Sequence, residues 1–359
     1  MRILMMISKN DKYGAQRIFL DQVSVLHDMG HHVVVVCRGS EGFVTDSVSA
    51  IGVPYYGIPM TGLRDVFFLR RLVKTDNIDI IHTTLDRADH MGLIVSRLTG
   101  RPVVSTNMVP RAHIGFRFDD RVVVLANKQR PVLLKAGVKP DKIMMIRPGI
   151  DVKRFAEPDR AKREMWRKRL KSDDYSTVLC HISSMLPRKS HDVSIDIAAE
   201  CLKLGERPLL VIIGDPVEGD YYESLRARAA ARGIEGMVYF TGWTRDVPEI
   251  LSLTHFTVLP SENEALGVVL MEGMAAGTPI IAREGEGGAE LIEEYGTGFL
   301  YRPSEGAGIV ADKLVALRRD GKRFAELSVR CRRIAAEQFS MQRFGERLNG
   351  VYEGLMMRH

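Results

Sequence analysis

The stretch PSENEALGVVLMEGMAAGTP, residues 260–279, indicates the fold of this chain most clearly. It opens with a turn signal, PSEN, and it follows the apolar run HFTVL at 255–259. Its apolar segment ends in small residues and in Gly277 and Pro279, which are typical signs of a helix end. The pattern therefore predicts a buried strand, a loop and a short helix.

Two glutamates in this stretch, Glu264 and Glu272, are candidates for ligand binding. If the helix begins near Leu266, Glu264 lies in the preceding loop and Glu272 lies about one and a half turns inside. The unpaired N–H groups and the dipole of a helix N-terminus favour negative charge, so this end can serve a glutamate or hold a diphosphate. Gly267 would let a ligand approach the main chain closely.

These features resemble the E-x7-E signature of retaining glycosyltransferases with the GT-B fold, in particular family 4. The match includes Pro-Ser, a Glu-x-x-Gly segment, the second glutamate and a small-residue tail. The resemblance implies that Glu264 contacts the transferred sugar and that Glu272 holds the ribose hydroxyls. The donor-binding residues expected in this stretch are Leu266, Gly267, Val268, Val269 and Glu272. An ordinary first-turn glutamate and a solvated helical glutamate are the alternative.

A cationic loop follows a second apolar run, STVLCHISS at 176–184. It contains Arg188 and Lys189, and such a pair can neutralise a diphosphate, the arginine as a planar fork and the lysine as a point charge. In the family that the chain resembles, a lysine at this place binds the donor diphosphate. The family's arginine usually stands earlier, where this chain has Ser184, so Arg188 is expected to take its role. A solvated charged turn is the alternative.

Short apolar runs alternate with helical patterns along the first half of the chain. Strands are expected at 2–7, 31–37, 53–58, 78–83, 101–106 and 121–126. Alternation of this kind predicts a doubly wound parallel sheet with helices on both faces. Ligands of such sheets bind at the carboxyl ends of the strands.

The resemblance assigns further residues to the two substrates. YGAQR at 13–17 resembles the Gly-Gly-Ala-Glu-Arg loop of family 4, which implies a role for Gly14 beside the donor phosphates. A plain helix start is the alternative. Gly214 resembles the glycine that ends a donor-side strand in the family. His82 and His113 are candidates for acceptor binding, and a structural role is the alternative for His82.

Length and composition suit a protein of two domains. The chain has 359 residues, of which 45% are hydrophobic and 27% are charged, as in soluble globular proteins. Its net charge is +6, and the excess of cations lies in residues 1–155. A solvated surface explains this excess, and an anionic acceptor or an anionic membrane surface near the first half explains it equally well.

Neither the cysteines nor the apolar segments point to an extracellular or membrane-spanning protein. The four cysteines are scattered, as expected of reduced thiols in the cytoplasm. No apolar run approaches the length of a membrane span. Residues 63–74 predict an amphipathic basic helix that either covers the sheet or lies on an anionic membrane, so the inner face of the membrane is a possible location.

The expected fold is α/β and of the GT-B type, with two Rossmann-like doubly wound parallel-sheet domains facing a central cleft. The acceptor-binding domain is expected at 1–155 with a crossing helix at 341–357, and the nucleotide-sugar-binding domain at 156–340. The charged segment 157–175 is expected to connect them.

The resemblance implies transfer of a sugar from a nucleotide-sugar donor to a glycan or lipid-linked acceptor, with retention of anomeric configuration, in cell-envelope polysaccharide or lipopolysaccharide biosynthesis. No flanked D-x-D is present, so neither a metal nor another cofactor is expected. Charge on the departing diphosphate is expected to be met by Arg188, Lys189 and helix amides. No nucleic-acid partner is expected. The alternatives are a nucleotide-sugar epimerase of GT-B architecture and an inactive sugar-nucleotide-binding module.

Overall fold

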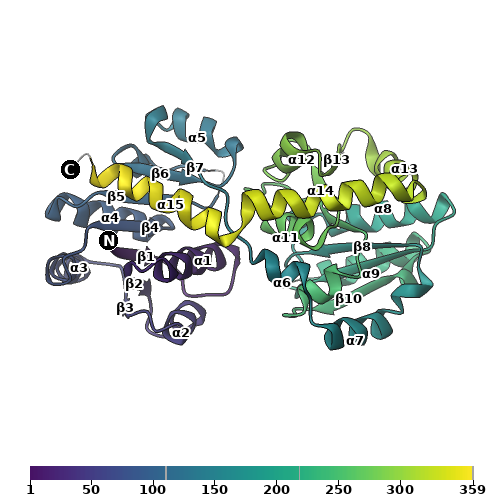
Figure 1. Cartoon of the computed structure of the whole chain (residues 1–359), viewed down its shortest axis with the longest axis horizontal. Coiled ribbons are helices and arrows are strands. Elements are labelled where there is room, and N and C mark those ends of the chain that lie inside the picture. The colour runs from purple at the N-terminus through teal and green to yellow at the C-terminus, as the bar shows by residue number, and fades with distance from the viewer. Residues whose placement is uncertain (110, 218, 358–359) are drawn as a thin grey trace. The chain divides into compact units, whose positions relative to one another are not determined.

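The computed structural model describes residues 1–109, 111–217 and 219–357, which form two compact units. Unit 1 comprises Met1–Gly149 and the C-terminal segment that begins at Met341, and unit 2 comprises Ile150–Ser340 (Figure 1). The chain therefore passes from unit 1 to unit 2 earlier than the expected 155/156 boundary. The reason is that α6 (Val152–Ala156) packs against α11 (Val268–Ala276) of unit 2.

Unit 1 is a seven-stranded parallel sheet with the strand order β3-β2-β1-β4-β5-β6-β7. Every strand expected from the sequence of this half is confirmed, with small shifts at the ends. The strands are β1 (Arg2–Ile7), β2 (His32–Arg38), β3 (Tyr55–Ile58), β4 (Ile80–Thr84), β5 (Val103–Asn107), β6 (Arg121–Val124) and β7 (Ile143–Met145). The helices are α1 (Gly14–Asp28), α2 (Phe43–Ala50), α3 (Leu63–Thr75), α4 (Asp86–Thr99), α5 (Arg130–Lys135) and α15 (Met341–Met356).

The last helix completes the core of unit 1. α15 packs against α1, and its side chains Phe344, Leu348, Tyr352 and Leu355 are buried among apolar residues of β1 and β2. These four positions recur at the spacing of one helical face, which explains why the segment folds as an amphipathic helix. α15 therefore lies in unit 1, at the place where the sequence predicts a crossing helix over 341–357.

Unit 2 is a six-stranded parallel sheet with the strand order β10-β9-β8-β11-β12-β13. Its strands are β8 (Thr177–Ile182), β9 (Pro208–Ile213), β10 (Val238–Gly242), β11 (Phe256–Leu259), β12 (Ile280–Arg283) and β13 (Gly298–Tyr301). Its helices, besides α6 and α11, are α7 (Arg160–Leu170), α8 (His191–Lys203), α9 (Tyr221–Ala231), α10 (Val247–Leu251), α12 (Ala289–Tyr295), α13 (Gly306–Arg319) and α14 (Gly321–Phe339).

The segment 157–175 is not a connection between the units. It forms α7 within unit 2, where α7 packs against α10. Trp166 is buried and its indole N–H donates to Asp246 at 3.1 Å. The many charged residues of α7 lie on the exposed side of the helix. Because its buried apolar side is narrow, the sequence pattern alone does not indicate a packed helix.

Candidate functional site

The two loops that the sequence singled out in unit 2 lie together at the carboxyl ends of β8 and β11. These strands are neighbours in the sheet, so the loops that follow them meet at one edge. The N–H of Glu262 donates to the carbonyl of Arg188 at 2.7 Å. Beside this contact, the ammonium of Lys189 forms an ion pair with the carboxylate of Glu264. Both side chains of the pair are mostly buried, with 14% and 17% of their surfaces exposed.

A third loop holds Glu264 in place. The carboxylate of Glu286 accepts hydrogen bonds from the N–H groups of Asn263 at 3.0 Å and of Glu264 at 2.8 Å. The N–H of Gly287 donates to the carbonyl of Glu264 at 3.2 Å. A Cβ at position 287 would lie 1.7 Å from the carbonyl oxygen of Ala265, so this contact requires glycine. Sequence reasoning missed Glu286, although the adjacent Gly-Gly pair marks its loop.

The N-terminus of α11 lies directly beside the ion pair. Gly267 is its N-cap residue with a φ of +80°, and no side chain caps the helix. A Cβ on Gly267 would lie 2.7 Å from the Leu259 side chain and 3.6 Å from Cγ of Glu264. The first amides of a helix have no intrahelical partners, so this end can receive an anion.

The other donor-site candidates at the start of α11 differ in how far their side chains are buried. Leu266 is buried, with 1% of its surface exposed, so only its main chain is open to a ligand role. Val268 and Val269 are half-buried in the first turn, and Glu272 is half-buried one turn further along. The backbone of the first turn therefore remains open to a ligand, and part of the Glu272 side chain is exposed beside it.

Arg188 and Gly214 contribute to the same edge of the sheet in different ways. The side chain of Arg188 is exposed, and no salt bridge to it exists within 1–109, 111–217 and 219–357. Gly214 has a φ of +145°, and a Cβ there would lie 2.1 Å from the carbonyl oxygen of Ser183. Only glycine allows the ends of β8 and β9 to approach this closely.

Two buried histidines lie below the cationic loop and were not predicted. His181 is hydrogen-bonded to Ser194 at 2.8 Å and to Ser183 at 3.0 Å, and Ser183 is bonded to His191 at 3.0 Å. The two imidazole rings stack with centroids 4.0 Å apart. Burial lowers the pKa of His191 to about 4 and the pKa of His181 well below its ordinary value. Both rings are therefore neutral and support the loop of Lys189 by packing rather than by charge.

Gly14, the remaining donor-site candidate, lies in unit 1. It is the first residue of α1 and is exposed, and Tyr13 before it makes no side-chain cap. A Cβ on Gly14 would meet no atom within 4 Å. The structure therefore shows an open helix start and no local reason for glycine at this position.

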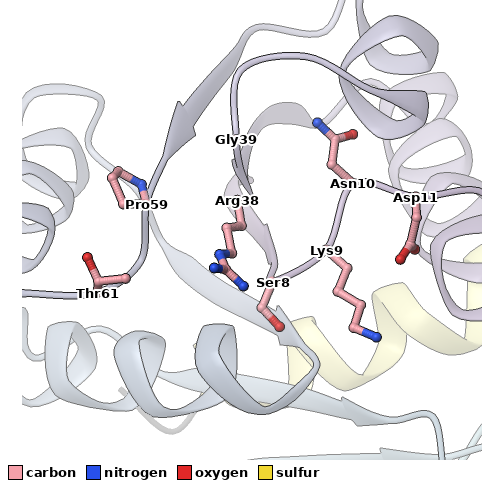
Figure 2. A pocket seen from close by; sticks show the side chains of 8 residues that line it. All are labelled: Ser8, Lys9, Asn10, Asp11, Arg38, Gly39, Pro59 and Thr61. Atoms are coloured by element: carbon pink, nitrogen blue, oxygen red, sulfur yellow. The ribbon is translucent and has the colours of Figure 1, made fainter.

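Unit 1 has a basic hollow of about 610 Å³ where β1, β2 and β3 end. Figure 2 shows Lys9 and Arg38 beside this hollow, with Ser8 and Asn10 from the same loop as the lysine. The side chain of Asn10 is used locally, because its oxygen accepts from the N–H groups of Val44 and Thr45 at the start of α2. Asp11 also lines the hollow, but the two cations outnumber it and make the hollow suitable for an anionic group.

His82 and His113, the acceptor-site candidates, have opposite environments. His82 is fully buried and its ring nitrogens are bonded to Tyr352 and, at 2.7 Å, to Thr106. Burial lowers the pKa of His82 to about 3. The buried side chain of His82 therefore cannot contact an acceptor directly, and its role in this structure is structural.

His113 instead lines a cavity of about 270 Å³ with Asn107 and Met108. Its Nε2 lies 3.2 Å from the carboxylate of Asp89. Burial acts to lower the pKa of His113, but the hydrogen bond and the nearby carboxylates outweigh it and raise the pKa. His113 thus holds a proton more readily than a free imidazole, and its ring packs between Phe116 and His90.

Two family models match the chain. The model described as Glycosyl transferases group 1 matches residues 162–338, within unit 2, and the model described as Glycosyltransferase Family 4 matches residues 13–154. The two matches span most of the chain. The chain therefore belongs to the group 1 glycosyltransferases, and its two Rossmann-like units have the GT-B fold.

Individual relatives agree with this class. The UDP-Gal:alpha-D-GlcNAc-diphosphoundecaprenol alpha-1,3-galactosyltransferase of Escherichia coli is 24% identical over 94% of this chain and 93% of its own length. A GDP-mannose-dependent alpha-(1-6)-phosphatidylinositol monomannoside mannosyltransferase of Mycobacterium tuberculosis is 33% identical over 43% of this chain and 41% of its own length.

Solved structures match the fold over nearly the whole chain. Anabaena Alr3699/HepE in complex with UDP has a TM-score of 0.88 at 19% identity, covering 99% of this chain and 100% of that chain. WaaG, a glycosyltransferase involved in lipopolysaccharide biosynthesis, has a TM-score of 0.72 at 19% identity, covering 98% of this chain and 100% of that chain. Within the described part of the chain, no helix is both long and apolar enough to cross a membrane.

Proposed function

We propose that this glycosyltransferase moves a sugar from a nucleotide-sugar donor to a glycan or lipid-linked acceptor of the cell envelope, with retention of anomeric configuration and without a metal at the donor diphosphate. The observation that supports this most is the Lys189–Glu264 pair at the uncapped N-terminus of α11. The names of the relatives support the substrate classes, since they include a UDP-Gal-dependent enzyme with a diphosphoundecaprenol acceptor.

Each group of the site has a proposed role. Lys189, Arg188 and the first amides of α11 stabilise the negative charge that develops on the diphosphate as the glycosidic bond breaks. Glu264 contacts the transferred sugar, and Glu272 accepts hydrogen bonds from the ribose hydroxyls. The acceptor oxygen then bonds to the anomeric carbon on the face that the diphosphate leaves, which retains the configuration, and the acceptor hydroxyl gives its proton to the departing diphosphate.

The donor site is tested by substitution in unit 2. We expect Lys189→Ala to weaken nucleotide-sugar binding by about 1.5–3 kcal/mol, roughly 10- to 150-fold in Kd, because a charged contact is lost. Glu272→Ala should weaken the binding of UDP or GDP itself. Isothermal titration with UDP, GDP and ADP sugars measures both effects and identifies the base. Lys203→Ala is the matched control, because the exposed Lys203 pairs with Glu200 at the end of α8 that lies away from the cationic loop.

The same assay defines what would overturn the proposal. Nucleotide binding at wild-type strength in both site variants would exclude this donor site. Formation of an isomeric nucleotide sugar in the absence of any acceptor would instead indicate an epimerase. The anomeric configuration of the product, read by NMR, tests retention, and nucleotide-sugar binding in excess chelator tests metal independence at the donor diphosphate.

We also propose that unit 1 binds peripherally to the cytoplasmic face of an anionic membrane, where a lipid-linked acceptor would be found. α3 packs against α4, and α4 packs against η1 (Ile114–Arg117). These three neighbours expose several large apolar side chains, namely Leu63, Phe67, Ile94, Leu98, Ile114 and Phe118. Exposed arginines on the same elements, namely Arg64, Arg71, Arg97 and Arg117, supply charge that complements anionic lipid headgroups.

A further inference from the structure

Two carboxylates and a histidine gather at the carboxyl ends of β4 and β5 in unit 1. Asp86 and Asp89 lie in the first turn of α4, and His113 lies in the segment that follows β5. One ligand atom from each of the three lies within 4.8 Å of the others. Asp89 and His113 are 3.2 Å apart, a spacing that suits two neighbouring ligands of one ion.

One buried oxygen atom of this group, Oδ1 of Asp89, has no hydrogen-bond partner among the described residues, and this points to a ligand. The Asp89 side chain is only 2% exposed, and its Oδ2 is bonded to His113. Its Oδ1 is buried and has no hydrogen-bond partner among residues 1–109, 111–217 and 219–357. The same aspartate lines the 270 Å³ cavity. A buried carboxylate oxygen without a donor is costly, and a cation in the cavity would remove that cost.

Other groups around the cavity do not supply the missing positive charge to Asp89. The guanidinium of Arg111 lies 3.8 Å from Asp86 and is mostly exposed. Asp119 adds a further buried carboxyl group close by, bonded to Ser105 at 2.7 Å. The cluster therefore has more acidic groups than basic ones around the buried carboxylate of Asp89.

We propose that Asp86, Asp89 and His113 bind a divalent transition-metal cation. A set of one imidazole nitrogen and two carboxylate oxygens suits Mn²⁺, Co²⁺ or Zn²⁺, whereas Mg²⁺ and Ca²⁺ prefer oxygen alone. Three protein ligands leave coordination positions open toward the cavity, where water or an acceptor oxygen can bind. The site lies wholly within unit 1 and does not depend on the proposed donor chemistry of unit 2.

The bound ion would add a further link between two elements that already pack against each other. It would attach the segment 111–118, including η1, to the first turn of α4. The exposed Ile114 and Phe118 belong to that segment, so the ion would also fix part of the proposed membrane-facing surface.

The test uses the full-length protein, stripped with chelator and titrated with Co²⁺ and Mn²⁺ without any nucleotide. We expect saturable binding of one ion, visible Co²⁺ absorption bands typical of a nitrogen and oxygen site, and a higher Tm. Asp86→Asn and His113→Gln should each weaken binding at least tenfold. Asp86 is well exposed, so its substitution leaves the core intact even if changes at the buried Asp89 impair folding. The control is His90→Gln, because His90 stacks near His113 without belonging to the ligand set.

Three results would overturn the assignment. The first is a wild-type protein that binds neither Co²⁺ nor Mn²⁺ up to millimolar concentration. The second is equal binding in the wild type, Asp86→Asn and His113→Gln, or equal weakening in the His90→Gln control. The third is stabilisation by methylammonium with no response to either metal, which would assign the cavity to an amine. None of these outcomes bears on nucleotide binding, so failure here is distinct from failure of the proposed function.

Discussion

Gly287 lies close against the main chain of the loop that carries Glu264. A Cβ at this position would lie 1.7 Å from the carbonyl oxygen of Ala265, which is a main-chain atom and cannot rotate away as a flexible side chain could. We expect Gly287→Ala to displace Glu264 and to lower kcat/KM on the order of 100-fold, the effect of an ångström-scale misplacement. Steady-state kinetics measure this. Gly236→Ala is the control, because a Cβ there meets nothing within 4 Å, and an equal loss in the control would refute the explanation.

Asp119 makes the stability of unit 1 depend on pH. Burial raises its pKa from 3.8 to about 7, the hydrogen bond from Ser105 opposes the rise, and Asp89 adds to it. A carboxyl group whose folded-state pKa is raised contributes stability that is fully present below 3.8 and is lost as pH rises through about 7.

Asp119→Asn should therefore stabilise the protein more at pH 8 than at pH 5, by on the order of 1–3 kcal/mol. Urea unfolding at the two pH values measures the difference. An equal effect at both values would show that the carboxyl group ionises in the folded state as readily as in the unfolded one.

The sequence could identify some site residues because a parallel sheet brings strand ends together. Lys189 and Glu264 follow strands that turn out to be neighbours, so their proximity could be anticipated from their positions alone. Glu286 and the pair of His181 and His191 could not be anticipated, because their roles depend on which loops and rings pack against each other. The burial of His82 likewise depends on Tyr352 of the last helix.

At the scale of elements, α3 matches the helix expected at 63–74 because its apolar and basic residues alternate with a helical period. The strands were equally clear from their continuous apolar runs. α7 was misread as a connection because charged residues surround its narrow buried side. Periodicity thus predicts elements whose apolar face is wide, and it fails where a few buried residues such as Trp166 suffice.

The exposed apolar residues of α3 should matter for membrane binding and not for folding. Leu63 is 76% exposed and Phe67 is 63% exposed. We expect Leu63→Ser with Phe67→Ser to reduce binding to vesicles of anionic lipid several-fold, at about 25 cal/mol for each Å² of apolar surface no longer buried, while Tm changes little. Vesicle sedimentation measures this. Val329→Ser, an exposed residue of α14 in unit 2, is the control, and unchanged sedimentation of the double variant would exclude this face.

At the scale of the whole molecule, the two units should differ in their ability to fold alone. Unit 2 is continuous from Ile150 to Ser340, whereas unit 1 needs the segment that begins at Met341. A fragment of residues 150–340 should unfold cooperatively by circular dichroism. A fragment of residues 1–149 should not, because five buried side chains of α15 would be missing from its core. Adding α15 in trans as a peptide should restore cooperativity, and a cooperative transition of 1–149 alone would contradict this.

The position of α15 also has a consequence during synthesis. Helices and strands fold as they leave the ribosome when their partners have already emerged. The first seven strands emerge early, yet the groove that receives Phe344 and Tyr352 stays open until translation has passed those codons. A chaperone or a transient collapse of the nascent chain must therefore shield that apolar groove while the second half is being made.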